Sequence, residues 1–251
     1  MAFINDTPLP SLGFICIECK LHRPPGDPFN GDTWSFPLIH EKAENSPVSA
    51  VVSSDKYDDG FVDRFVDAGM RLAERGAVGI ITSCGFLAMA QQELAARLPI
   101  PIATSSLVQI PSLLTLLPPS RSVGILTYDE TRLGKPHLEK LGIPVSRCRI
   151  RGASRNGTLR RHIELGVQYV HEDILAELVE VSRQLVVDHS EIAVLCLECT
   201  NMPPFSEEIQ SATGLPVYDV YTMGQWFYGG LARRAPLKWG DIPKDKLETR
   251  A

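Results

Sequence analysis

Two pairs of cysteines with the same spacing are the residues of this chain best suited to chemistry. Cys16 and Cys19 form one C-x-x-C pair, and Cys196 and Cys199 form the other, within VLCLECTNMPP. A thiol can bind a metal, form a redox disulfide, act as an acid-base group or nucleophile, or pack as a small apolar side chain. The elements that carry the cysteines decide among these roles.

Both pairs lie in apolar runs that are typical of strands, whereas zinc-binding pairs lie in tight turns. Residues i and i+3 of a strand point to opposite faces, so one ion cannot hold both Cys196 and Cys199. We therefore expect no metal. A redox disulfide between these two residues is an alternative, although a thioredoxin-like motif follows its strand instead of lying inside it. We interpret Cys16, Cys19, Cys148 and Cys196 as packing residues.

Cys84 and Cys199 differ from the other four cysteines in their position. Each comes at the C-terminal end of an expected strand and directly before a helical pattern, where open α/β sheets bind ligands. Backbone N–H groups at a helix N-terminus favour a thiolate, so the positions predict reactive thiols. The alternative is that both are buried packing residues, present twice because the chain repeats itself.

The apolar pattern predicts an α/β fold. Residues 11–18, 49–54, 77–84, 122–128 and 191–199 are short runs typical of buried strands. Between them, residues 60–76 place Phe61, Phe65, Met70 and Leu72 at helical spacing, and residues 171–190 show a similar pattern. Strands that alternate with helices predict a mostly parallel sheet covered on both faces.

The pattern occurs twice. Ser11-Leu12-Gly13-Phe14 and Ser122-Val123-Gly124-Ile125 open two similar halves, and corresponding features recur at an offset of about 115 residues. We infer an internal duplication that gives two pseudo-symmetric lobes, each an open sheet flanked by helices, with the active site in the cleft between them. The predicted domains are residues 1–118, with 221–251 packing back on them, and residues 119–220.

Composition excludes several classes of protein. The chain has 251 residues, 44% of them hydrophobic and 22% charged, with a net charge of -5 and a pI near 5.7. This balance disfavours nucleic acid as a partner and favours a small molecule. The sequence shows neither a signal-peptide pattern nor an apolar run long enough to span a membrane, so we expect a cytoplasmic protein with reduced thiols.

Two thiols in one cleft would suit proton exchange at a stereocentre. One thiolate would remove the proton from one face of a small molecule while the opposite thiol supplies a proton to the other face. Backbone N–H groups at the two helix starts would hold the carboxylate and stabilise an enolate-like intermediate. This chemistry requires no cofactor.

The residues around the two cysteines resemble a known group. Cys84-Gly85-Phe86 and Cys199-Thr200-Asn201, one in each half, resemble the aspartate/glutamate racemase superfamily, which includes hydantoin racemases, maleate isomerases and arylmalonate decarboxylases. The resemblance covers nearly the whole chain. It implies two lobes, paired catalytic cysteines, and contacts of Thr200 and the amides after Cys84 with the substrate carboxylate. It leaves a homo-oligomer open, because enzymes of this group often dimerise.

Departures from the family pattern narrow the substrate. Glutamate racemases typically have Cys-Asn-Thr and Cys-Thr-His at the two sites, whereas this chain has Gly85-Phe86 and Asn201. Asn201 cannot act as an acid or base and Phe86 makes the pocket less polar, which disfavours glutamate. Arylmalonate decarboxylases keep only the second-lobe cysteine, so Cys84 favours racemisation or isomerisation over decarboxylation.

Four further residues are candidates for substrate contact. Arg23 lies in a Pro/Gly-rich loop after the first strand and suits a bidentate contact with a carboxylate; an ordinary surface loop is the alternative reading. Thr127 and Tyr128 end the matching second-lobe strand, and Glu18 ends the first-lobe strand.

The sequence thus predicts a racemase or epimerase that acts on a small carboxylate, an amino acid or a hydantoin-like derivative, without a cofactor. The alternatives are a decarboxylase or maleate-type cis-trans isomerase on the same scaffold, and a non-catalytic two-lobe protein that binds a small molecule.

Overall fold

A computed structural model describes residues 8–233 and contains two parallel sheets of four strands each. The strand order is β2-β1-β3-β4 in the first sheet and β6-β5-β7-β8 in the second, so the two lobes share one topology. The strands are β1 (Leu12–Glu18), β2 (Leu38–Pro47), β3 (Ile80–Thr82), β4 (Ile102–Ala103), β5 (Ser122–Thr127), β6 (Cys148–Gly152), β7 (Ile192–Leu197) and β8 (Val217–Tyr218). The predicted two-lobe α/β fold is confirmed.

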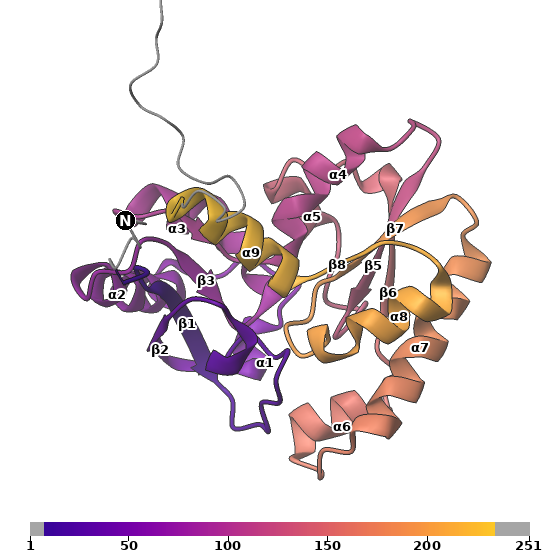
Figure 1. Ribbon diagram of the computed structural model, residues 1–251, viewed down its shortest axis with the longest axis horizontal. Helices are drawn as coiled ribbons and strands as arrows, with labels where there is room; N and C mark the ends of the chain where they lie inside the picture. The colour runs from indigo at the N-terminus through magenta and orange to yellow at the C-terminus, as the bar shows by residue number, and fades with distance from the viewer. Residues whose placement is uncertain (1–7, 234–251) are drawn as a thin grey trace, which may run out of the picture.

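Helices flank both sheets, and the two lobes lie side by side (Figure 1). The α-helices are α1 (Val48–Val51), α2 (Asp59–Glu74), α3 (Gln91–Arg97), α4 (Ile110–Leu116), α5 (Lys135–Lys140), α6 (Thr158–Leu165), α7 (His171–Asp188), α8 (Ser206–Thr213) and α9 (Val220–Leu231). Short 3-10 helices are η1 (Gly31–Thr33), η2 (Gly85–Ala90), η3 (Ser106–Gln109), η4 (Val145–Arg147) and η5 (Pro203–Phe205).

The two long amphipathic helices form where their apolar periodicity predicts them. Asp58 begins α2 as its N-cap and accepts a hydrogen bond from the backbone N–H of Phe61. The same helix buries Phe65 and Leu72 against the sheet, whereas Met70 is 39% exposed and lies off the buried face that its spacing had suggested. Later in the chain, α8 ends at Thr213, and the residue that caps it, Gly214, has a φ of 69° that suits glycine.

One predicted strand is wrong. Residues 49–54 fall on the short helix α1 and the turn after it, although the run of Val and Ser favours a strand. The strand on the outer side of β1 is instead β2, the polar segment LIHEKAENSP directly before α1. Because β2 is an edge strand with most of its side chains partly or fully exposed, it lacks the apolar run by which buried strands are found.

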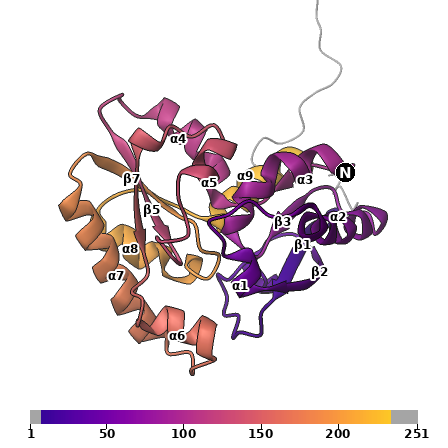
Figure 2. The ribbon, with the colours of Figure 1, turned by 180° about the vertical axis from the view of Figure 1, so that it is seen from behind.

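The helix α9 contributes to the core of the first lobe. Val220, Met223 and Tyr228 share a buried cluster with Leu12 and Phe14 of β1. In Figures 1 and 2, α9 accordingly lies on the side of the first sheet, beside α3. The predicted return of residues 221–251 to the first lobe includes a part, residues 234–251, that lies outside the described residues.

Residues 8–233 lack two structural features. No described helix combines the length and the apolar character that crossing a membrane requires. Within the same residues, no group of three or more His, Cys, Asp or Glu side chains is arranged to hold a metal ion.

Candidate active site

Cys84 and Cys199 lie at equivalent ends of the two sheets. The strands β3 and β7 hold the same inner position in their sheets, and each cysteine stands two residues beyond the end of its strand. The backbone of Cys84 is extended and begins η2. The side chains are almost buried, with 9% of Cys84 and 7% of Cys199 exposed. The pseudo-symmetry therefore brings two thiols to corresponding places.

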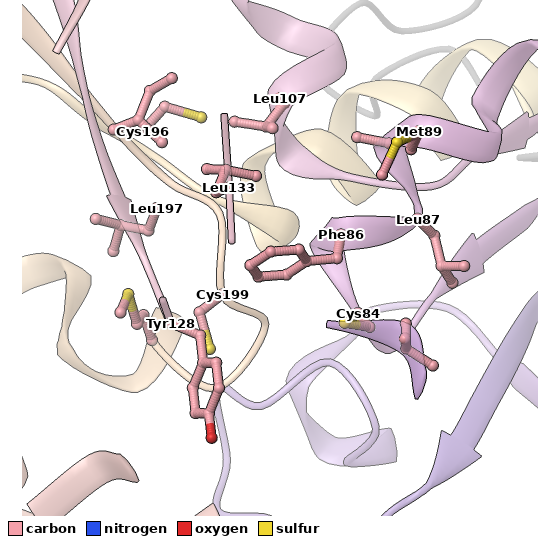
Figure 3. Close-up of a cluster of buried hydrophobic side chains, with 14 of the residues drawn as sticks. Cys84, Phe86, Leu87, Met89, Leu107, Tyr128, Leu133, Cys196, Leu197 and Cys199 are labelled. Carbon is pink, nitrogen blue, oxygen red and sulfur yellow. The ribbon is translucent and has the colours of Figure 1, made fainter. Parts of the chain in front are cut away.

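Both cysteines line one cavity between the lobes. Figure 3 shows Cys199 and Tyr128, from the second lobe, facing Cys84 and Phe86, from the first. The cavity has a volume of about 30 Å³, which is room for about one water molecule, so a substrate requires its walls to move apart. Its wall consists of Ile17, Cys19, Arg23, Val48, Val52, Ser83, Cys84, Gly85, Phe86, Tyr128, Ile163, Glu198, Cys199, Thr200 and Asn201.

The expectation of a thiolate stabilised by a helix N-terminus is wrong for this closed cavity. Burial raises the pKa of Cys84 well above its ordinary value, and the charge of Glu198 raises it further. Burial and then Glu198 act in the same direction on the pKa of Cys199. The backbone N–H groups of Phe86 and Asn201 oppose these shifts but are smaller in effect than burial and the charge of Glu198. Both thiols are therefore protonated at neutral pH.

Glu198 is the functional candidate that sequence reasoning missed. Its side chain is 1% exposed and lines the same cavity as both thiols. Its Oε2 accepts a hydrogen bond of 2.7 Å from the hydroxyl of Thr127, while Oε1 has no hydrogen-bond partner among the residues that the structure describes. Burial raises its pKa to about 7, against hydrogen bonds from the Thr127 hydroxyl and the Tyr128 N–H. A carboxyl that exchanges protons near neutral pH thus lies beside two thiols. The only signal in the sequence is an acidic residue directly before Cys199 in an otherwise apolar strand.

The loop around Arg23 closes one side of the cavity. Arg23 forms an ion pair of 3.1 Å with Asp27, and Asn201 donates a hydrogen bond of 3.0 Å to the same carboxylate oxygen. The loop of the first lobe is thereby attached to the segment after Cys199 in the second. Arg23 lines the cavity with a partner already in place, and a substrate carboxylate would compete with Asp27 for its guanidinium.

The other residues predicted to contact substrate lie in the cavity wall, behind it or outside it. Gly85, Phe86, Tyr128, Thr200 and Asn201 line the cavity with the two cysteines. Thr127 is fully buried behind them and holds Glu198.

Glu18 is the last residue of β1 and is not part of the cavity wall. It accepts a hydrogen bond from the N–H of Asn45 and lies 3.8 Å from Lys42. The structure therefore gives this candidate a role within the first lobe.

Thr200 connects the lobes directly. Its hydroxyl donates a hydrogen bond of 2.7 Å to the carbonyl of Ser83, the residue before Cys84. We expect Thr200→Val to lower the free energy of unfolding by about 1–3 kcal/mol, because the buried carbonyl loses its donor. Urea denaturation would measure the change. The control is Thr115→Val, since the Thr115 hydroxyl donates to the carbonyl of Ser112 in its own helix. Equal effects of the two substitutions would contradict a specific link between the lobes.

Comparison with known proteins identifies relatives among lyases. No protein-family model matches the chain. It is similar to a dimethylsulfoniopropionate lyase from Durusdinium sp. clade D, with 28% identity over 225 residues, 88% of this chain and 74% of that protein. It is also similar to dimethylsulfoniopropionate lyase 6 of Emiliania huxleyi (strain CCMP1516), with 26% identity over 85% of this chain and 57% of that protein. The chain thus matches little more than half the length of the Emiliania relative.

Solved structures with the same fold come from racemases and a decarboxylase. Unliganded arylmalonate decarboxylase matches with a TM-score of 0.59 and 19% identity, over 90% of this chain and 94% of that one. Allantoin racemase from Pseudomonas fluorescens matches with a TM-score of 0.56 and 16% identity, over 88% and 91% of the two chains. Picrophilus torridus aspartate racemase matches with a TM-score of 0.55 and 12% identity, over 92% and 97%.

The chain therefore has the two-lobe fold of the aspartate/glutamate racemase superfamily. This confirms, at the level of the fold, the resemblance that the two cysteine motifs indicated.

Proposed function

We propose that the chain is a cofactor-independent enzyme that removes the proton from the carbon next to the carboxylate of a small substrate. Cys84 and Cys199 are its acid-base groups. The observation that carries this proposal is their position, one from each lobe, in the wall of a single cavity. A proton on carbon is removed efficiently when a base is held beside it and the developing negative charge is stabilised.

A lyase reaction is the first candidate for the step after proton removal. The relatives found among curated proteins are named dimethylsulfoniopropionate lyases. In such an elimination the base takes the proton, the electron pair of the C–H bond forms a double bond, and neutral dimethyl sulfide leaves with its bonding pair. The product is acrylate. The rings of Phe86 and Tyr128 in the cavity wall suit a sulfonium cation, which aromatic faces attract.

Racemisation is the second candidate, and a different observation favours it. An elimination with a neutral leaving group needs one base, whereas this cavity has two thiols that come from opposite lobes. Two opposed acid-base groups are what return of the proton to the other face requires. Racemases also share the fold.

Decarboxylation and cis-trans isomerisation are further reactions of the same kind of site. Arylmalonate decarboxylase has this fold. Loss of carbon dioxide would leave the same carbanion that proton removal creates, and one thiol would protonate it. A cis-trans isomerase would use one cysteine as a nucleophile that adds to the alkene and leaves again.

A substrate panel distinguishes these reactions. The purified chain would be incubated separately with dimethylsulfoniopropionate, single enantiomers of amino acids and 5-substituted hydantoins, an arylmalonate and maleate. Gas chromatography would detect dimethyl sulfide, chiral chromatography inversion, and further assays carbon dioxide or fumarate. We expect release of dimethyl sulfide or inversion of a stereocentre. Binding of these carboxylates without turnover of any would contradict the proposal and favour a two-lobe binding protein.

A further inference from the structure

The described residues offer a hydrogen-bond partner to one carboxyl oxygen of Glu198 and none to the other. A role in stabilising the fold does not explain this arrangement. Oε2 is held by the Thr127 hydroxyl, and the N–H of Tyr128 also bonds to the carboxylate. Oε1 is buried and has no hydrogen-bond partner within residues 8–233. A buried polar atom without a partner is costly, so a residue that is kept in this state calls for a function.

The unpartnered oxygen lies against the first-lobe cysteine segment. A Cβ atom added to Gly85, the residue after Cys84, would overlap both Oε1 and the backbone carbonyl of Glu198. In the other direction Glu198 is bonded covalently to Cys199. One carboxyl group therefore lies at the junction of the two thiol segments, and the missing side chain of Gly85 provides the space for it.

The surroundings of Glu198 contain few charges that could balance it. Arg23 lines the same cavity, but its guanidinium is paired with Asp27. Most of the groups around a negative charge at this place are therefore weak acids, which do not neutralise it. The titratable groups that face Glu198 or share its cavity are Cys19, Cys84, Cys196, Cys199, Tyr57, Tyr128 and Arg23.

We propose that Glu198 is a third acid-base group of the site, which stores the proton that Cys84 or Cys199 must release to become a base. The inference rests on the proposed function. The site carries one negative charge, which is on Glu198 in the closed cavity and on one thiol when substrate is attacked. Because the Glu198 charge disfavours both thiolates, protonation of this carboxyl favours the formation of one of them.

The proton transfers balance. The S–H bond of a thiol breaks, its electron pair stays on sulfur, and the proton passes through a water molecule in the shared cavity to Oε1 of Glu198, where it forms an O–H bond. The thiolate then takes the proton from the carbon next to the substrate carboxylate and becomes a thiol again. In an elimination, Glu198 finally releases its proton to solvent, which accounts for the one proton that the overall reaction produces.

Glu198→Gln separates this role from a purely structural one. The amide has nearly the same shape and keeps an oxygen for the Thr127 hydroxyl, but it cannot take a proton from a thiol. We expect the thiols of this variant to ionise at lower pH than those of the wild type, because the opposing charge is gone. We nevertheless expect its turnover to fall at least about tenfold with little change in KM. A structural role alone would not make the thiols easier to ionise and at the same time slow turnover.

The titration needs no substrate. Ultraviolet absorbance of thiolates would be followed against pH, and the same titration of a Cys84→Ser/Cys199→Ser background would be subtracted to isolate the two thiols. Glu208→Gln is the control, since it removes one exposed carboxylate from the first turn of α8. Glu198→Asp keeps a carboxylate and is expected to return the thiol midpoint toward that of the wild type.

The outcomes distinguish the proton store from the proposed function. An unchanged or raised thiol midpoint in Glu198→Gln would overturn the role of Glu198, even if the enzyme turns over a substrate of the panel. A lowered midpoint with unchanged or faster turnover would overturn it as well. A lowered thiol midpoint without turnover of any substrate would support the electrostatic link between Glu198 and the thiols. It would contradict only the proposed enzymatic function.

Discussion

Replacing Cys199 with serine is expected to reduce turnover about 10²–10⁴-fold while the fold is kept. Serine has nearly the size of cysteine, so the wall of the cavity changes little. Its hydroxyl is a far weaker acid than a thiol, and it cannot become the base that removes a proton from carbon. Steady-state kinetics on the substrate identified by the panel would measure the loss, with circular dichroism to verify folding.

The same loss is expected for Cys84→Ser if both thiols exchange protons. Cys16→Ser is the matched control, because Cys16 belongs to the first of the two C-x-x-C pairs, is partly exposed and lies outside the cavity wall. This control should keep full activity. Wild-type turnover in Cys199→Ser would refute the acid-base assignment, and a loss in Cys199→Ser without a loss in Cys84→Ser would favour a one-base elimination.

Gly85→Ala is expected to abolish turnover and to lower the free energy of unfolding by about 1–3 kcal/mol. The added Cβ atom would overlap both the carboxyl group and the backbone carbonyl of Glu198. Since the carbonyl belongs to the backbone, it cannot turn away as a flexible side chain does. Cys84 and Cys199 would therefore be pushed apart. Urea denaturation and kinetics of the same preparation would measure both effects.

Gly229→Ala is the control for Gly85→Ala. Gly229 is an exposed position of α9 where an added Cβ atom meets no atom of residues 8–233 within 4 Å. Alanine is favoured over glycine in a helix by about 0.5–1 kcal/mol, so this variant should be slightly more stable and fully active. If Gly85→Ala behaved in the same way, the close approach of Glu198 to Gly85 would be incorrect.

The sequence predicted the architecture because the buried strands carry it. Segments such as Ser122–Thr127 and Ile192–Leu197 are almost wholly buried, and buried parallel strands are recognised as continuous apolar runs. The repeat then indicated two lobes, and the strand ends indicated Cys84 and Cys199. The polar edge strand Leu38–Pro47 lacks such an apolar run. Residues 49–54, which follow it, were predicted to be a strand because of their valines, although they form part of the short helix α1 and the turn after it.

The chemistry of the site was less accessible from the sequence than its location. The ionisation of Cys84 was predicted from a helix N-terminus, whereas burial and a neighbouring carboxyl group decide it in the structure. Glu198 escaped notice because its importance depends on residues far away in the chain, the hydroxyl of Thr127 and the missing side chain of Gly85. Contacts between residues so far apart in the chain leave no local pattern.

Exchange of the substrate proton with solvent tests the central claim most directly. The wild type, Cys84→Ser and Cys199→Ser would be incubated in D₂O with the substrate that the panel identifies, and proton NMR would follow the hydrogen next to the carboxylate in recovered substrate and product. The account predicts a wild type that breaks this C–H bond, with deuterium entering the carbon if racemisation occurs, and variants that leave the bond intact. Cleavage of the bond at the wild-type rate in both variants would contradict the claim that the two thiols carry out the proton transfer.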